Sequence, residues 1–218
     1  MLQSSTIDFL KQLADNNSKE WFEIHKKLYD AAKKDHEAYV NDVLQSMMAR
    51  EEGFSGQKVK DCVFRIFRDV RFSKNKAPYK TNFGAVFAKG GKKTPGAGYY
   101  VHLEPGKSFV GGGIWNPEND ILKKIRQEID YNLPEFESIL KEKNFSKLFK
   151  SIDGDKLKKA PQGYDEANPA MDYLKMKSFT VGTAITDAEV LGKNFADKTL
   201  TIFTAMKPFI DFLNRSVE

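Results

Sequence analysis

Residues 82–115 read NFGAVFAKGGKKTPGAGYYVHLEPGKSFVGGGIW, and they predict the sheet at the centre of the fold. Its runs of β-branched and aromatic residues predict strands, which we place at 82–88, 98–104 and 108–115. The turns between them, at 90–96 and at Pro105-Gly106, are short. Because parallel strands need a crossover of a dozen or more residues, such short turns favour antiparallel pairing.

Helices are expected on both sides of this region. Apolar residues spaced by three, four and seven positions predict a long amphipathic helix. We expect it to extend from residue 18 to about residue 50, with room for a bend. The stripe comprises Trp21, Ile24, Leu28, Ala32, Tyr39, Val43 and Met47. Asn116 and Pro117 predict the start of a later helix. A short strand is expected within 175–185, and a final helix from near Asn194 towards Asn214.

These elements predict one α+β domain over residues 1–218, with terminal helices covering a central, mainly antiparallel sheet. Its helical part spans 1–60, its sheet-forming part 61–115, and its last part, 116–218, is helical with a long ordered loop. No run of about 18 apolar residues and no secretory signal are present, so we expect a cytoplasmic protein that does not bind membranes. The single cysteine, Cys62, cannot form an internal disulfide and is expected to be a buried, inert thiol.

Positive charge is concentrated in one segment. Residues 61–108 carry 10 Lys and Arg against 3 Asp and Glu, a net charge of +7, whereas 1–60 and 109–218 each have a net charge of −1. The densest part is 65–81, RIFRDVRFSKNKAPYKT. A local field of this sign raises the concentration of nearby anions. The candidate ligand-binding residues are Arg65, Arg68, Asp69, Arg71, Lys76, Tyr79 and Lys80.

Three interpretations of this basic segment stay open. The first is a site for a small phosphorylated or carboxylated ligand, because Arg suits bidentate recognition of such groups. The second is a binding surface for the nucleic-acid backbone. The third is a structural network of ion pairs without catalysis. The residues do not decide whether the protein is an enzyme; in an enzyme, Asp69 or Tyr79 would move a proton.

The segment from Cys62 to Arg68 is also expected to be a strand. If 63–71 were regular, Arg65 and Arg71 would share one face and Arg68 would lie on the other. Convergence of all the cations on one ligand would therefore require a bend or bulge near Arg68-Asp69; otherwise Arg68 takes part in ion pairing on the core side and only the others reach the ligand. Asp69 is expected to hydrogen-bond to at least one Arg or Lys.

Few other residues in the sequence suggest catalysis or metal binding. His102 and Glu104 lie two residues apart on one face of a predicted strand, where they could serve acid–base chemistry, half a metal site or a surface pair. Gly111-Gly112-Gly113 lacks the spacing of a phosphate-binding loop and is expected to permit close backbone packing or a bulge. We predict no metal site and no cofactor.

The spacing R-x-x-R-D-x-R-F-x-x-x-N-K-x-x-Y over residues 65–79 resembles the signature of a bacterial family, domain of unknown function 2461. Flanking segments are similar as well: Asn17 to Phe22, Gly111 to Pro117, and Pro161 to Asp165. The resemblance covers nearly the whole chain and implies one domain of the expected length. It carries no activity and no catalytic roles.

Overall fold

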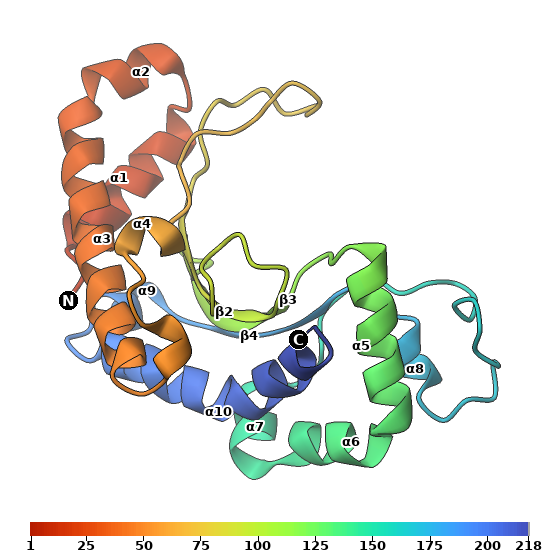
Figure 1. Cartoon of the computed structure of the whole chain (residues 1–218). Coiled ribbons are helices and arrows are strands. Elements are labelled where there is room, and N and C mark those ends of the chain that lie inside the picture. Colours follow the sequence, from red (N-terminus) through yellow and green to blue (C-terminus); the bar gives the residue numbers. More distant parts are fainter. Residues whose placement is uncertain (218) are drawn as a thin grey trace. The chain divides into compact units, whose positions relative to one another are not determined.

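The computed structural model describes residues 1–217, which form an α+β fold with one four-stranded antiparallel sheet (Figure 1). The strands pair in chain order and are β1 (Phe83–Phe87), β2 (Gly98–Leu103), β3 (Phe109–Ile114) and β4 (Phe179–Ala184). The three strands expected within 82–115 and their antiparallel pairing are confirmed. The fourth strand lies within the predicted region 175–185.

The chain divides into two compact units, each assembled from three separate segments. Unit 1 contains residues 1–92, 100–110 and 184–200, and unit 2 contains 93–99, 111–183 and the chain from Thr201 onward. All of the candidate ligand-binding residues named above belong to unit 1.

Unit 1 begins with three helices within residues 4–48, called the helical hairpin below. Its helices are α1 (Ser4–Asp15), α2 (Lys19–Ile24), α3 (Lys26–Met48), the 3-10 helix η1 (Glu52–Phe54), α4 (Val59–Cys62) and α9 (Asp187–Val190). The predicted long helix is thus divided at His25, whose backbone leaves the helical region (φ −101°, ψ 18°). Ile24 and Leu28, predicted as part of its apolar stripe, are instead 80% and 44% exposed, because they flank this break.

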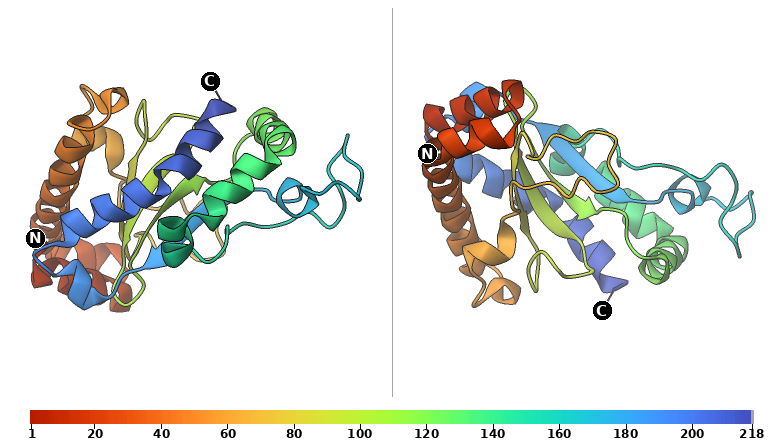
Figure 2. Two further views of the ribbon diagram at one scale, coloured as in Figure 1. Left: turned by 90° about the horizontal axis from the view of Figure 1, so that it is seen from below. Right: turned by 90° about the horizontal axis from the view of Figure 1, so that it is seen from above.

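Unit 2 contains a packed cluster of aromatic rings. Its helices are α5 (Asn119–Tyr131), α6 (Leu133–Lys141), α7 (Lys143–Leu148), α8 (Met171–Leu174) and most of α10 (Phe195–Arg215). Phe136 packs on Phe209 and Phe212, and Phe145 also contacts Phe209. The segment 151–170 contains no helix or extended strand and forms the expected long loop (Figure 2).

The predicted start of the helix after β3 is wrong. α5 begins three residues after Asn116, with Glu118 at its N-cap. Asn116 takes a positive φ of 48°, and its amide donates to Ser178 Oγ at 2.9 Å. The backbone therefore first turns towards Ser178 and becomes helical only afterwards.

Strand alternation gives β2 one buried and one more open face. Tyr99, Val101 and Leu103 are buried, whereas Tyr100 and His102 point the other way and are only partly covered. Because side chains alternate along a strand, Glu104 continues the face of Tyr100 and His102. In unit 1 this polar face of the sheet carries the groups described below.

Cys62–Arg68 is not a regular strand. Cys62 ends α4, and the following residues make only isolated antiparallel bridges, Val63 to Ala85 and Phe67 to Tyr79. The opposite segment contains Pro78, which has no N–H to extend a ladder, and the Tyr79 backbone is bonded to a side chain instead. Cys62 is completely buried as expected, and burial raises the pKa of its thiol to about 11.

His36 on α3 predicts a pH-dependent stability. Its ring is 2% exposed and stacks on Phe83, with 5.0 Å between ring centroids. Burial lowers the pKa of His36 to about 4, against the opposing charge of Asp35. An unfolded histidine binds a proton below about pH 6.5, so the unfolding free energy should fall by about 3 kcal/mol between pH 6.5 and pH 4 from this group alone.

Urea unfolding of wild type and His36→Leu between pH 7 and pH 4 tests this prediction. Carboxylates contribute equally to both proteins, so the difference between the two pH profiles isolates His36. Parallel profiles would show that His36 takes up its proton in the folded protein as readily as in the unfolded one.

Candidate functional site

The basic segment forms a hairpin, called the basic hairpin below, that precedes β1 in the chain and pairs with it at one end. Phe64 N donates to Gly84 O at 3.0 Å, Lys80 N to Ile66 O at 2.8 Å, and Arg68 N to Pro78 O at 2.9 Å. The two extended segments and their connecting turn are visible in Figures 1 and 2. The hairpin thus places residues 64–68 and 78–80 side by side.

Two of the predicted ligand-binding cations hold the hairpin turn together. The Arg68 guanidinium donates to Ala77 O at 3.0 Å and to Ser73 Oγ at 3.3 Å. Lys76 Nζ donates to Val70 O at 3.0 Å. These bonds satisfy turn oxygens that lack a sheet partner, so both side chains have a structural task.

Tyr79 is anchored to the helical hairpin. Its ring stacks on Phe22 of α2, with 4.0 Å between centroids and 12° between planes, and its residue is 4% exposed. Asn17 Nδ2 donates to Tyr79 O at 3.0 Å, and Tyr79 N donates to Asn17 Oδ1 at 3.1 Å. Burial, followed by the charges of Glu23 and Glu20, raises the pKa of the Tyr79 hydroxyl. Tyr79 therefore fixes the base of the basic hairpin.

Asp69 is paired with Arg71, which confirms the expected contact to a cation. Arg71 Nε and Nη2 donate to its carboxylate at 3.0 and 2.6 Å. Bonds from the Arg71 side chain and backbone, and then the charge of Arg65, lower the pKa of Asp69. The two side chains are 76% (Arg71) and 45% (Asp69) exposed, so this is a local surface pair.

Arg65 and Lys80 are the cations that the hairpin leaves together without a carboxylate partner. Within residues 1–217, no ion pair joins either side chain to an acid, and Asp69 near Arg65 is already bonded by Arg71. Burial, and then the charge of Arg65, lowers the pKa of Lys80. Lys80 Nζ lies 5.4 Å from the centre of the Phe64 ring. Two positive charges thus repel one another at the base of the hairpin.

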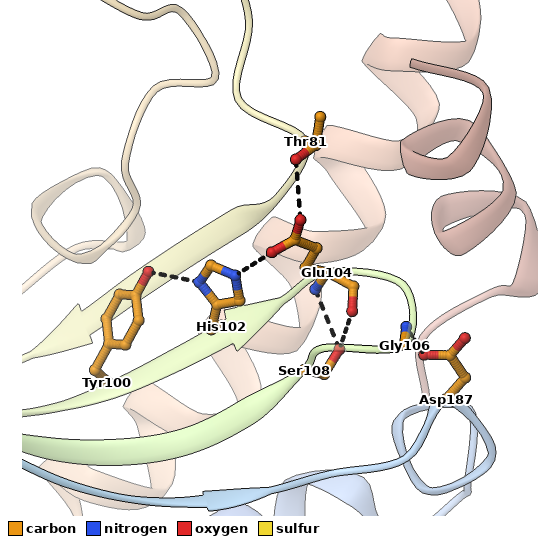
Figure 3. A network of polar contacts seen from close by, with 7 residues as sticks. All are labelled: Thr81, Tyr100, His102, Glu104, Gly106, Ser108 and Asp187. Atoms are coloured by element: carbon orange, nitrogen blue, oxygen red, sulfur yellow. Dashed lines mark hydrogen bonds and ion pairs between the residues drawn. The ribbon is translucent and has the colours of Figure 1, made fainter. Parts of the chain in front are cut away.

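A chain of three hydrogen-bonded side chains lies on the polar face of β2 (Figure 3). Tyr100 Oη is 3.1 Å from His102 Nδ1, and His102 Nε2 is 3.0 Å from Glu104 Oε2. Thr81, the residue after Lys80, donates its hydroxyl to Glu104 Oε1 at 3.1 Å. The hairpin base and the β2 side chains are therefore linked directly.

The protonation pattern of this chain follows from Glu104. Burial raises its pKa, but the hydrogen bonds from His102 and Thr81 outweigh burial and leave the pKa lowered. Because a carboxylate only accepts, His102 Nε2 carries a hydrogen, and in the corresponding tautomer of an uncharged imidazole Nδ1 is the acceptor. The Tyr100 hydroxyl is then the donor, and burial raises its pKa to about 12.

Packing fixes the orientation of these groups. The His102 ring stacks on Phe109 of β3 with 4.8 Å between centroids, and Phe64 meets the Tyr100 ring edge-on at 6.3 Å. A Cβ on Gly84 would lie 2.5 Å from Tyr100 Oη, so only glycine leaves room for the hydroxyl. Sequence reasoning paired His102 with Glu104 but missed Tyr100 and Thr81. The alternation of positions 100, 102 and 104 was the available signal for Tyr100.

Neither a metal cluster nor a membrane span is found in the described part of the chain. No group of three or more His, Cys, Asp or Glu side chains among residues 1–217 is arranged to hold an ion. Within the same residues, no helix has both the length and the apolar character needed to cross a bilayer.

The fold and this polar sheet face define an α+β protein with a basic hairpin beside a Tyr-His-Glu chain. Residues 5–212 match the family described as a conserved hypothetical protein, DUF2461. The chain belongs to this family, and the resemblance seen in residues 65–79 agrees with it. No curated protein and no solved structure shows significant similarity to the chain.

Proposed function

We propose that the protein binds a small anionic ligand, phosphorylated or carboxylated, at the base of the basic hairpin, where Arg65 and Lys80 provide the charge. The main support is that Lys80 N donates to the carbonyl of Ile66, the residue after Arg65, so the two cationic residues lie on paired segments, and neither has an ion-pair partner within residues 1–217. Like charges held together in a folded protein cost free energy, and an anion between them would remove that cost.

The two side chains differ in a way that suits such a ligand. The guanidinium of Arg65 offers a planar fork for two ligand oxygens, whereas the ammonium of Lys80 acts as a compact point charge. Lys80 is partly covered, which weakens the screening of its charge by solvent. The remaining predicted cations are engaged with Asp69 or with turn oxygens, and Arg71 keeps the exposure needed to reach a larger ligand.

Titration calorimetry with inorganic phosphate, pyrophosphate and citrate tests the proposal. Hydrogen bonds to charged groups contribute about 1.5–3 kcal/mol, so Arg65→Gln and Lys80→Gln should each weaken binding by about 10-fold to 100-fold. Arg50→Gln and Lys74→Gln are matched controls, because each removes one exposed positive charge that has no ion-pair partner within residues 1–217. Their affinities should stay within about 2-fold of wild type.

Two outcomes would count against the anion site. Equal weakening by all four variants would mean that only net charge matters. Absence of binding to every anion, together with unfolding of Arg65→Gln, would favour the purely structural role.

A second candidate, binding of single-stranded nucleic acid, is favoured by one observation. Phe72 is 95% exposed at the hairpin turn, beside Arg71 and Lys74, and Arg71 lies 5.8 Å from its ring centre. An exposed ring among cations can stack on a base while the cations contact phosphates. Binding of a labelled oligothymidylate that falls steeply with salt and is weakened by Phe72→Ala would support this candidate over the small ligand.

A further inference from the structure

Tyr100, His102 and Glu104 form a polar chain whose ends differ chemically. At one end Glu104 is a carboxylate that accepts from His102 and Thr81. At the other end Tyr100 Oη is 3.1 Å from His102 Nδ1, and in the tautomer that carries its hydrogen on Nε2 the hydroxyl donates, which leaves lone pairs on its oxygen to accept another hydrogen. A proton arriving at Tyr100 can therefore displace the hydroxyl proton onto His102, and Glu104 would stabilise the resulting imidazolium.

The position of this chain relates it to the cation pair. Thr81, bonded to Glu104, directly follows Lys80, and Phe64 contacts both the Lys80 ammonium and the Tyr100 ring. Arg65 and Lys80 have no ion pair within residues 1–217, and Asp69, which the charge of Arg65 also reaches, is bonded to Arg71, so a ligand with more than one negative charge suits the two cations. A phosphate monoester carries between one and two negative charges near neutral pH, whereas a single carboxylate carries one.

We propose that Tyr100, His102 and Glu104 are a proton relay that makes the anion site hydrolytic, with phosphate monoesters as the substrate class. This inference rests on the proposed function, because Arg65 and Lys80 must hold the phosphoryl group.

The proposed step balances without a redox partner. A water molecule attacks phosphorus while its O–H bond breaks, and its proton passes to Tyr100 Oη as the Tyr100 proton moves to His102 Nδ1. The ester P–O bond breaks, and the relay returns one proton to the departing oxygen. The products are the alcohol and inorganic phosphate. Arg65 and Lys80 stabilise the negative charge of the phosphoryl oxygens during the transfer.

Steady-state hydrolysis of 4-nitrophenyl phosphate, with inorganic phosphate as a competitive inhibitor, tests the relay. General acid–base groups contribute about 10²-fold to 10⁴-fold, so Tyr100→Phe and His102→Gln should each lower kcat by that factor. Their inhibition constants for phosphate should stay within about 3-fold of wild type. Glu104→Gln should also lower kcat, because an amide cannot stabilise an imidazolium as a carboxylate does. Tyr131→Phe, which removes a hydroxyl from a 72% exposed residue, is the control and should leave kcat unchanged.

The outcomes separate the relay from the anion site. Phosphate binding that depends on Arg65 and Lys80, without any hydrolysis by wild type, would overturn the relay and leave the proposed function intact. Hydrolysis that survives in both Tyr100→Phe and His102→Gln would also overturn the relay. Failure of phosphate to bind would overturn the site and the relay together. If His102→Gln does not fold, the isosteric Tyr100→Phe variant decides the question.

Discussion

Replacement of Gly113 by alanine should lower the unfolding free energy by about 3–5 kcal/mol, the sum of backbone strain and overpacking. Gly113 in β3 has a φ of 123°, a conformation that L side chains rarely adopt. An added Cβ would lie 2.0 Å from Phe179 O and 2.8 Å from Thr180 Cα, which are backbone atoms of β4. Relief of this clash would require separation of two paired strands, and urea denaturation measures the loss.

Gly106 offers the matched control. It also has a positive φ, 72°, but a Cβ there would meet no atom within 4 Å. Gly106→Ala should therefore cost only the backbone strain of about 1–2 kcal/mol. If the two variants proved equally stable, the tight approach of β3 and β4 at Gly113 would be wrong.

Asn17→Ala should lower the unfolding free energy by about 2–6 kcal/mol, because it leaves two polar groups of the Tyr79 backbone without partners, at about 1–3 kcal/mol each. Both bonds join residues 62 positions apart and tie the basic hairpin to the helical hairpin. Anion binding should weaken as well, since Lys80 follows Tyr79 directly. Urea denaturation and phosphate titration of the same variant measure the two effects.

Asn16 provides the comparison for Asn17. Its side chain donates locally to Gln12 O at 2.9 Å and is exposed. Asn16→Ala should therefore change stability by no more than about 0.5 kcal/mol, as is usual for surface positions. A small effect for Asn17→Ala would mean that water replaces the lost bonds and that stacking of Tyr79 on Phe22 is enough to hold the hairpin.

Local patterns account for most of the correct predictions. The strands β1, β2 and β3 follow from β-branched and aromatic runs between short turns, because alternation and turn chemistry are properties of adjacent residues. The pairing of Asp69 with Arg71, and of His102 with Glu104, also joins residues only two positions apart. Two of the wrong predictions, at Cys62–Arg68 and Asn116, involve partners far along the chain: Asn17 binds the Tyr79 backbone, and Ser178 binds Asn116.

The order of residues was enough to predict the α+β class, the antiparallel sheet and the concentration of positive charge in one segment. The contacts that each charged side chain makes became visible only in the folded chain. Arg68 and Lys76 donate to turn oxygens, and Tyr79 is stacked on Phe22, whereas Arg65 and Lys80 have no ion-pair partner among residues 1–217. The physical reason is that a charge interacts across space with whatever the fold places near it, and the order of residues does not specify those neighbours.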